Sequence, residues 1–460
     1  MIAALRGSGG KTLVSVGLTA VWREQGWAVA PFKKGPDYID AGWLSAAAEH
    51  PCRNLDLFLH EEEVIRHSFI RGAAGRDLAV IEGNRGLFDG MDARGTCSSA
   101  ELAKLLRIPV VLVLDCAKTT RTVGALVLGC QQFDPEVSIG GVVLNRVAGP
   151  RHESILREVI EQRSGLPILG VIPKLAGSHF PERHLGLVPH QEHSGVADAI
   201  HAAARAAEEY LDLAALIHLA RTAPPLGLTV DPGGARHMGP TSSEGVLIGV
   251  CRDAAFQFYY PENLEALVQQ GGRLVEVSPL SDDALPEVDA LYIGGGFPET
   301  FAAELAENQG FRHSVAQAVE TGLPVYAECG GAVYLGDKLV ADNRTFPMAG
   351  ALPLTFGFGK KPQGHGYAIL EVAAANPYFP EGMSLRAHEF HYSRVLDLDA
   401  SKLSFAFRLQ RGHGFDGKHD GVCYRNVLAS YCHLHALSAQ SWAESLVKAA
   451  ARFRRASPRR

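Results

Sequence analysis

The chain has 460 residues, 47% of them hydrophobic and 20% charged, which is enough for two or more domains with sizeable cores. Its net charge of −6 is spread along the chain and gives no electrostatic reason to expect nucleic acid or a membrane surface as a partner. No apolar run approaches the roughly 20 residues needed to cross a bilayer. The eight cysteines lack CxxC spacing, which favours neither a zinc site nor a disulfide framework. We expect a cytoplasmic protein.

The first predicted elements are a short apolar strand, a glycine-rich turn and a helix. The turn, RGSGGKT at 6–12, departs from GxxxxGK[ST] because Leu5 stands six residues before Lys11, and it resembles deviant Walker A loops. Backbone N–H groups of such a turn and the helix N-terminus bind phosphates, the lysine reaches the outer phosphates, and the hydroxyl binds magnesium. The predicted nucleotide-binding residues are Gly7, Gly9, Gly10, Lys11 and Thr12.

Acidic residues follow in two stretches, PFKKGPDYID (31–40) and VIEGNRGLFDG (80–90). Glu82 ends an apolar strand, and ligands of open α/β sheets bind at the carboxyl ends of strands. Carboxylates near a triphosphate require a cation, and Mg²⁺ prefers one or two carboxylates with phosphate oxygens and water. We predict Thr12, Asp37 and Glu82 as magnesium ligands. Simple turn capping is the alternative for Asp37, Asp40 and Asp89.

Strands and helices then alternate, which predicts an α/β domain with a mostly parallel sheet. Asn145 closes the apolar strand at 140–145, where it either contacts adenine or caps the strand. A stretch rich in Pro, Gly, Ser and Thr predicts a linker, after which the alternation restarts. The predicted organisation is a P-loop domain at 1–220, a linker at 221–245, a second α/β domain at 246–452 and a basic tail at 453–460.

The second domain carries a different pattern, beginning with the strand, cysteine, two glycines and helix of LPVYAECGGAVYLG (323–336). A sharp strand-to-helix turn presents a nucleophile, Cys329, at a helix N-terminus whose dipole lowers thiol pKa. His433, in VLASYCHLHALS, is the predicted general base, and backbone N–H groups of Gly295 and Gly296 are the predicted oxyanion hole. A structural cysteine and a core histidine are the alternatives. The order glycine-rich turn, Cys, His is that of triad-type glutamine amidotransferase domains.

Several longer motifs resemble the cobyrinic acid a,c-diamide synthase family over nearly the whole chain. They are the P-loop, KKGPDYID, EGNRGLFDG, RDAAFQFYYPENLE, GGGFPE, AECGG, RAHEFHYS and NVLASYCHLH. The resemblance implies a dethiobiotin synthetase-like N-terminal domain and a class I amidotransferase-like C-terminal domain. It implies amidation of two tetrapyrrole carboxylates with ATP, Mg²⁺ and L-glutamine. The implied roles are nucleotide and magnesium binding for Lys11 and Thr12, a synthetase site of Asp37, Asp40, Glu82 and Asp89, the nucleophile for Cys329 and its base for His433.

Two positions depart from the family pattern. His435 stands where class I amidotransferases have a carboxylate, so a dyad of Cys329 and His433 is predicted. Relatives continue GPDYID with Pro and an aromatic-His pair, whereas this chain has AGWL at 41–44, where the tetrapyrrole is expected to dock. Siroheme and nickel sirohydrochlorin therefore stay open as substrates beside cobyrinic acid, and a homodimer stays open as an assembly. A deviant Walker A ATPase switch is the alternative from another class.

Overall fold

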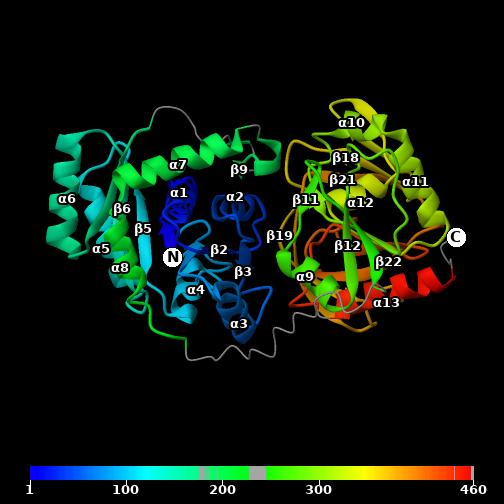
Figure 1. The fold of residues 1–460 in the computed structure, drawn as a ribbon, viewed down its shortest axis with the longest axis horizontal. Coiled ribbons are helices and arrows are strands. Elements are labelled where there is room, and N and C mark those ends of the chain that lie inside the picture. Colours follow the sequence, from blue (N-terminus) through cyan, green and yellow to red (C-terminus); the bar gives the residue numbers. More distant parts are fainter. Residues whose placement is uncertain (176–181, 184–185, 194, 227–244, 440, 457–460) are drawn as a thin grey trace. The chain divides into compact units, whose positions relative to one another are not determined.

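A computed structural model describes residues 1–175, 182–183, 186–193, 195–226, 245–439 and 441–456. The chain forms two compact units, Met1–Gly234 and Ala235–Arg460 (Figure 1). Most of the predicted linker, at 227–244, and the end of the predicted tail, at 457–460, lie outside the described residues. The predicted α/β class is confirmed in both units.

The first unit is built on a seven-stranded sheet whose strands all run parallel. The strand order is β3 (Arg53–Leu55), β2 (Val29–Lys34), β4 (Leu78–Glu82), β1 (Ile2–Ala4), β5 (Val110–Asp115), β6 (Ile139–Val147) and β7 (Ile168–Pro173). Their near-continuous apolar sequences are those of strands covered on both faces. Ile2 pairs with Glu82 in the neighbouring strand, and the backbone N–H of Leu87 donates to the carbonyl of Ala4 (2.7 Å), so the loops that follow β1 and β4 lie side by side.

Helices cover both faces of this sheet. Residues of α1 (Lys11–Glu24), α2 (Ile39–Ala48), α7 (Val196–Tyr210) and α8 (Leu213–Ala220) share one core with Ile2 and Ala4. The intervening Ala3 points to the other face, whose cores contain residues of α3 (Glu62–Ala73), α4 (Ser99–Leu106), α5 (Arg121–Phe133) and α6 (Pro150–Ser164). This alternation follows from the period of two along a strand. Three short elements complete the unit: β8 (Glu182–Arg183), β9 (Gly186–Leu187) and the 3₁₀ turn η1 (His190–Glu192).

The second unit has a mixed nine-stranded sheet. Five parallel strands come first: β12 (Gly272–Val277), β10 (Val246–Cys251), β13 (Ala290–Ile293), β15 (Val325–Glu328) and β24 (Val427–Ser430). Four antiparallel strands continue it: β23 (His419–Tyr424), β22 (Ser404–Arg411), β19 (Gly364–Val372) and β20 (Ser384–His391). A smaller sheet holds β17 (Arg344–Pro347), β16 (Lys338–Ala341), β18 (Leu354–Phe358) and β21 (Ser393–Leu398), and β11 (Phe256–Phe258) pairs with β14 (Gly295–Gly296).

Two cores lie on opposite faces of the large sheet. Val325 and Ala327 of β15 share one core with residues of α10 (Ala302–Glu307), α11 (Gln309–Glu320) and α12 (Gly330–Leu335). Tyr326 belongs to the other core, with residues of α9 (Pro261–Gln269) and α13 (Ser441–Ala456). Helix α13 thus contains 453–456, the first residues of the predicted tail. Among the described residues, no helix combines the length and hydropathy that a membrane crossing requires.

Candidate active sites

The P-loop begins where β1 ends, and α1 begins at Lys11. Gly10, the residue before the helix, has φ +99°, a backbone conformation that favours glycine. A Cβ on Gly10 would also overlap Nδ2 of Asn145. Glycine is therefore required here both by backbone conformation and by space. Gly9 is also tightly placed, since a Cβ on it would lie 3.1 Å from Cβ of Ala4. Gly7 has open space around its Cα.

Asn145 supports the P-loop through its side chain. Its Nδ2 donates to the carbonyl of Gly9 (3.1 Å), and its Oδ1 accepts from the backbone N–H of Arg146 (2.9 Å). Asn145 lies inside β6, which continues to Val147, so its carboxamide supports the P-loop and does not cap the strand end. Lys11 Nζ donates to the carbonyls of Arg6 (3.3 Å) and Arg85 (2.9 Å), so its ammonium group lies between the loops that follow β1 and β4.

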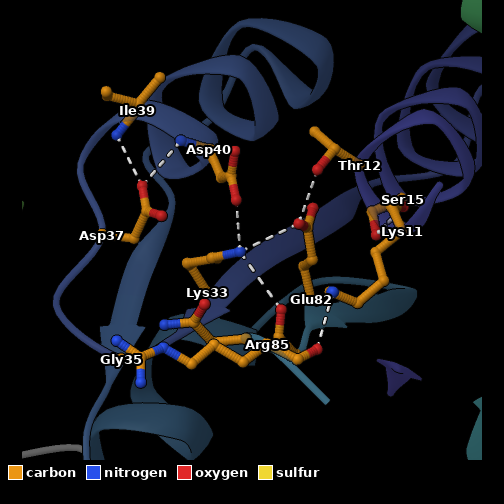
Figure 2. A network of polar contacts seen from close by, with 12 residues as sticks. Lys11, Thr12, Ser15, Lys33, Gly35, Asp37, Ile39, Asp40, Glu82 and Arg85 are labelled. Carbon is orange, nitrogen blue, oxygen red and sulfur yellow. Dashed lines mark hydrogen bonds and ion pairs between the residues drawn. The ribbon is translucent and has the colours of Figure 1, made fainter. Parts of the chain in front are cut away.

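A buried lysine occupies the centre of the predicted acidic cluster (Figure 2). Lys33 Nζ lies 2.6 Å from Oδ2 of Asp40 and 3.0 Å from Oε1 of Glu82, and it also donates to the carbonyl of Gly83 (3.2 Å). Burial lowers the pKa of Lys33, but Asp40 and Glu82 outweigh it and raise that pKa above its ordinary value. The sequence did not predict that Lys33 pairs with these acids. Its only indication of a buried lysine was the position of two adjacent lysines at the end of an apolar strand.

Glu82 links the P-loop to this lysine. Its Oε1 accepts from the hydroxyl of Thr12 (2.9 Å) as well as from Lys33, whereas its Oε2 is buried and has no hydrogen-bond partner among the described residues. Burial outweighs the attraction of Lys33 and raises the pKa of Glu82 to about 7. The structure therefore joins two predicted magnesium ligands, Thr12 and Glu82, and leaves one carboxylate oxygen available.

The other predicted acids have local roles as well. Oδ1 of Asp37 accepts from the backbone N–H groups of Ile39 (2.9 Å) and Asp40 (3.0 Å), and burial raises the pKa of Asp37 to about 6. Oδ2 of Asp89 accepts from the N–H of Gly86 (2.9 Å), and Asp89 is exposed. Within the described part of the chain, no group of three or more His, Cys, Asp or Glu side chains converges as a ready-made metal site.

The stretch at 41–44 lies in α2, and two of its side chains belong to the core. Trp43 and Leu44 are fully buried, and the indole N–H of Trp43 donates to the carbonyl of Val188 (2.9 Å). These two side chains therefore do not present a surface to a tetrapyrrole. Docking beside this stretch stays a prediction.

In the second unit, Cys329 lies in the turn between β15 and α12. Its φ of +48° and ψ of −103° are strained for a residue with a Cβ, as at a nucleophile elbow. Its backbone N–H donates to the carbonyl of Ser430 (2.7 Å), at the end of the neighbouring strand. A Cβ on Gly330 would lie 3.0 Å from the backbone N of Gly296, which places this predicted oxyanion-hole residue beside the nucleophile turn.

His433 lies three residues beyond β24 and is buried. Its backbone exchanges two hydrogen bonds with His388 (3.2 and 2.8 Å), and the two imidazole rings stack with centroids 4.9 Å apart. A Cβ on Gly295 would overlap Cε1 of His433, so the glycine leaves room for the imidazole. Neighbouring strands thus bring the nucleophile turn, the glycine pair and the histidine to one edge of the sheet.

The expected lowering of the thiol pKa by the helix dipole is not found. Burial raises the pKa of Cys329 well above its ordinary value, and the charge of Glu299 raises it further. A hydrogen bond from the backbone N–H of Gly330, at the start of α12, lowers that pKa but does not offset the burial. The thiol therefore needs a proton acceptor to become a thiolate. All eight cysteines are free and buried.

The two units define a class of protein in which a P-loop domain is joined to a glutamine amidotransferase domain. Residues 1–187 match the CobQ/CobB/MinD/ParA nucleotide binding domain, and residues 247–441 match the CobB/CobQ-like glutamine amidotransferase domain. A deviant Walker A ATPase switch lacks the second domain, so that alternative is dropped.

Full-length relatives specify the family. The chain is 46% identical to the cobyrinate a,c-diamide synthase of Magnetococcus marinus, over 97% of this chain and 96% of that protein. It is 40% identical to the synthase of the same name from Archaeoglobus fulgidus, over 98% and 97%, and 37% identical to that of Methanosarcina acetivorans, over 99% and 95%. The chain belongs to the cobyrinate a,c-diamide synthase family, as its motifs predicted.

Proposed function

We propose that the chain catalyses ATP- and glutamine-dependent amidation of the a and c acetate carboxylates of cobyrinic acid. The observation that carries this proposal is the presence, in one chain, of a P-loop beside a carboxylate with a free oxygen and a strained cysteine turn near a buried histidine. The names of the relatives support cobyrinate as substrate and give no support to siroheme or nickel sirohydrochlorin.

The first unit supplies the activation step. A carboxylate resists attack by ammonia, whereas its acyl phosphate carries a good leaving group. The substrate carboxylate oxygen attacks the γ-phosphorus of ATP, ADP departs, and ammonia then displaces phosphate to give the amide. Lys11 and the loop N–H groups would stabilise the charge on the transferring phosphoryl group. Lys33 would hold Asp40 and Glu82 in place around it.

The residues beside Lys11 fit a magnesium ion. Thr12 and Glu82 present oxygen ligands, and the buried Oε2 of Glu82 has no hydrogen-bond partner among the described residues. We assign Thr12 and Glu82 as its protein ligands, with Asp37 as a second carboxylate. Bound magnesium would neutralise the phosphate charge. Asp40 and Asp89 would complete the synthetase site through Lys33 and through the loop after β4.

The second unit supplies ammonia. The thiol proton of Cys329 passes to His433, and the sulfur attacks the carboxamide carbon of glutamine. N–H groups at Gly295 and Gly296 would stabilise the oxyanion. The C–N bond breaks, the proton on His433 leaves with ammonia, and the γ-glutamyl thioester that remains is hydrolysed to glutamate.

Offering the purified chain cobyrinic acid, siroheme or nickel sirohydrochlorin in parallel, each with ATP, magnesium and glutamine, tests the substrate. Each amidation replaces OH by NH₂, so the monoamide and the diamide differ in mass from the substrate and from each other. We expect both amides from cobyrinic acid, with the monoamide appearing first. Lack of any mass change in all three samples would remove tetrapyrroles from the proposal.

Replacing the nucleophile separates the two half-reactions. Cys329→Ala should abolish amidation with glutamine and leave amidation with an ammonium salt intact, because free ammonia bypasses the second unit. Cys423→Ala is the control, since that cysteine is also buried and lies in β23, away from the turn. Equal loss with both nitrogen sources would contradict the assignment of Cys329.

A further inference from the structure

A buried carboxylate lies directly beside His433. Glu328, the last residue of β15, is fully buried, and its Oε2 lies 3.5 Å from Nδ1 of His433. The hydroxyl of Tyr292 donates to Oε2 (3.3 Å), while the hydroxyl of Tyr326 (3.0 Å) and the backbone N–H of Leu434 (3.1 Å) donate to Oε1. Every one of these groups is a donor, which suits an ionised carboxylate because it only accepts.

The residue two positions after His433 faces another partner. Nδ1 of His435 accepts from the backbone N–H of Leu437 (3.3 Å), and its Nε2 lies 3.5 Å from Oε2 of Glu262. Its ring packs against Tyr260 with centroids 4.5 Å apart. His435 therefore forms a second buried pair with a carboxylate, whose members differ from those of the pair of His433 and Glu328.

The two ring nitrogens of His433 are distinguished by the carboxylate of Glu328. Glu328 lies at Nδ1, and the stacked ring of His388 fixes the plane of the imidazole. A proton held on Nδ1 by a carboxylate makes Nε2 the acceptor. The separation of 3.5 Å is longer than the roughly 2.7–3.2 Å of a good N–H···O hydrogen bond, and such contacts tighten when substrate binds.

We propose that Glu328 is the positioning carboxylate of the glutaminase site and replaces the acid that class I amidotransferases carry two residues after the histidine. It holds the Nδ1–H of His433, stays ionised while Nε2 takes the thiol proton of Cys329, and stabilises the imidazolium that forms. That proton then leaves with ammonia as the C–N bond breaks. The inference rests on the proposed glutaminase activity of this unit.

The test compares two charge-removing variants in the full chain, Glu328→Gln and Glu262→Gln. Both carboxylates are buried and both lie 3.5 Å from a histidine nitrogen, but only Glu328 faces His433. Glu328→Gln should lower the glutamine-dependent kcat by about 10²- to 10⁴-fold. It should leave KM for glutamine and ammonium-dependent amidation little changed. Glu262→Gln should keep the wild-type glutamine-dependent rate.

A pH profile separates positioning from simple packing. A carboxylate favours the charged imidazolium, so the acid limb of the glutaminase kcat/KM profile should move to lower pH in Glu328→Gln. Tyr292, Tyr326, Cys329 and His388 also face this pair, and all of them are unchanged in both variants. In Glu262→Gln the acid limb should stay where it is.

Two results would overturn the inference: a wild-type rate and acid limb in Glu328→Gln, or an equal loss in Glu262→Gln. Should Glu328→Gln also lose ammonium-dependent amidation, Glu328→Asp decides, because it restores a carboxylate. Partial recovery of rate and acid limb in Glu328→Asp would support the inference, and no recovery would overturn it. Absence of glutaminase activity in the wild-type chain, with ammonium-dependent amidation retained, would instead mark failure of the proposed function of the second unit.

Discussion

At the scale of single residues, a buried lysine offsets part of the negative charge near the P-loop. Lys33 is 1% exposed and pairs with both Asp40 and Glu82, and without it the buried carboxylate of Glu82 would be costly. Even so, burial keeps the pKa of Glu82 near 7. The carboxyl group therefore changes charge within the range in which enzymes are assayed, and it does so beside the lysine and threonine of the P-loop.

Removing the charge of Glu82 should disable the synthetase site selectively. Glu82→Gln keeps the side-chain shape, and we expect amidation with either nitrogen source to fall by a factor of about 100 or more, as when a charge-stabilising group is lost. Hydrolysis of glutamine should continue, because its residues lie in the second unit. The rate of glutamate formation measures glutamine hydrolysis, and the rate of amide formation, on the same sample, measures amidation. An unchanged amidation rate would show that Glu82 only ends the strand and has no role in the synthetase site.

The raised pKa of Glu82 also predicts linkage between protons and the bound metal nucleotide. A cation binds the carboxylate form, so affinity for ATP with magnesium should rise as pH increases through 7 and level off above it. Calorimetry in two buffers of different ionisation enthalpy should detect proton release at pH 6.5. In Glu82→Gln the released fraction should fall, and equal proton release by both proteins would contradict the assignment.

At the scale of elements, close approaches fix which helix covers which strand. Gly17 of α1 faces α7, and a Cβ on it would lie 2.5 Å from the carbonyl oxygen of Ala203 and 3.1 Å from Cβ of Ala207. The two helices therefore pack backbone to backbone at this point. In the second unit, the six-residue α12 starts from a strained turn, which aims Cys329 at the expense of local stability.

Gly17→Ala should lower stability although alanine favours helices. We expect a loss of about 1–3 kcal/mol, since overpacking against backbone atoms outweighs the gain in helix propensity. Gly129→Ala in α5 is the matched control, because a Cβ there has no neighbour within 4 Å. That variant should gain up to about 1 kcal/mol. Thermal unfolding of the wild type, Gly17→Ala and Gly129→Ala measures the two changes in stability. A stabilised Gly17→Ala would contradict the close packing of α1 and α7.

At the scale of the whole molecule, the chain consists of two units with separate cores. Each unit has its own sheet and carries one of the two proposed half-reactions. Among the described residues, no strand of the first unit pairs with a strand of the second, so each sheet is formed within its own unit.

We expect thermal unfolding in two steps. ATP with magnesium, at ~100 times its Kd, should stabilise only the first unit by ~2.7 kcal/mol. A glutamine analogue that alkylates Cys329 should shift only the other transition. Calorimetric scans with each ligand and with both test this expectation. A single transition shifted equally by either ligand would show that the units unfold together.

The sequence by itself determined the fold class and the family, and most residues of the two proposed sites were chosen from it. Apolar strands alternating with helices specify α/β units because such strands must be covered on both faces. Gly10, Lys11 and Cys329 were identifiable because a phosphate loop and a nucleophile turn need particular residues at adjacent positions. Each of these patterns involves residues that are adjacent in the chain, so it can be recognised without the tertiary structure.

Only the tertiary structure decided which distant side chains meet. Lys33 and Glu82 are 49 residues apart, and Glu328 and His433 more than twice as far, yet paired parallel strands place each pair within 3.5 Å. Burial, also a property of the packed fold, raised rather than lowered the pKa of Cys329 and placed the side chains of Trp43 and Leu44 in the core. Strand register and desolvation depend on contacts between segments far apart in the chain, so residue spacing alone does not determine them.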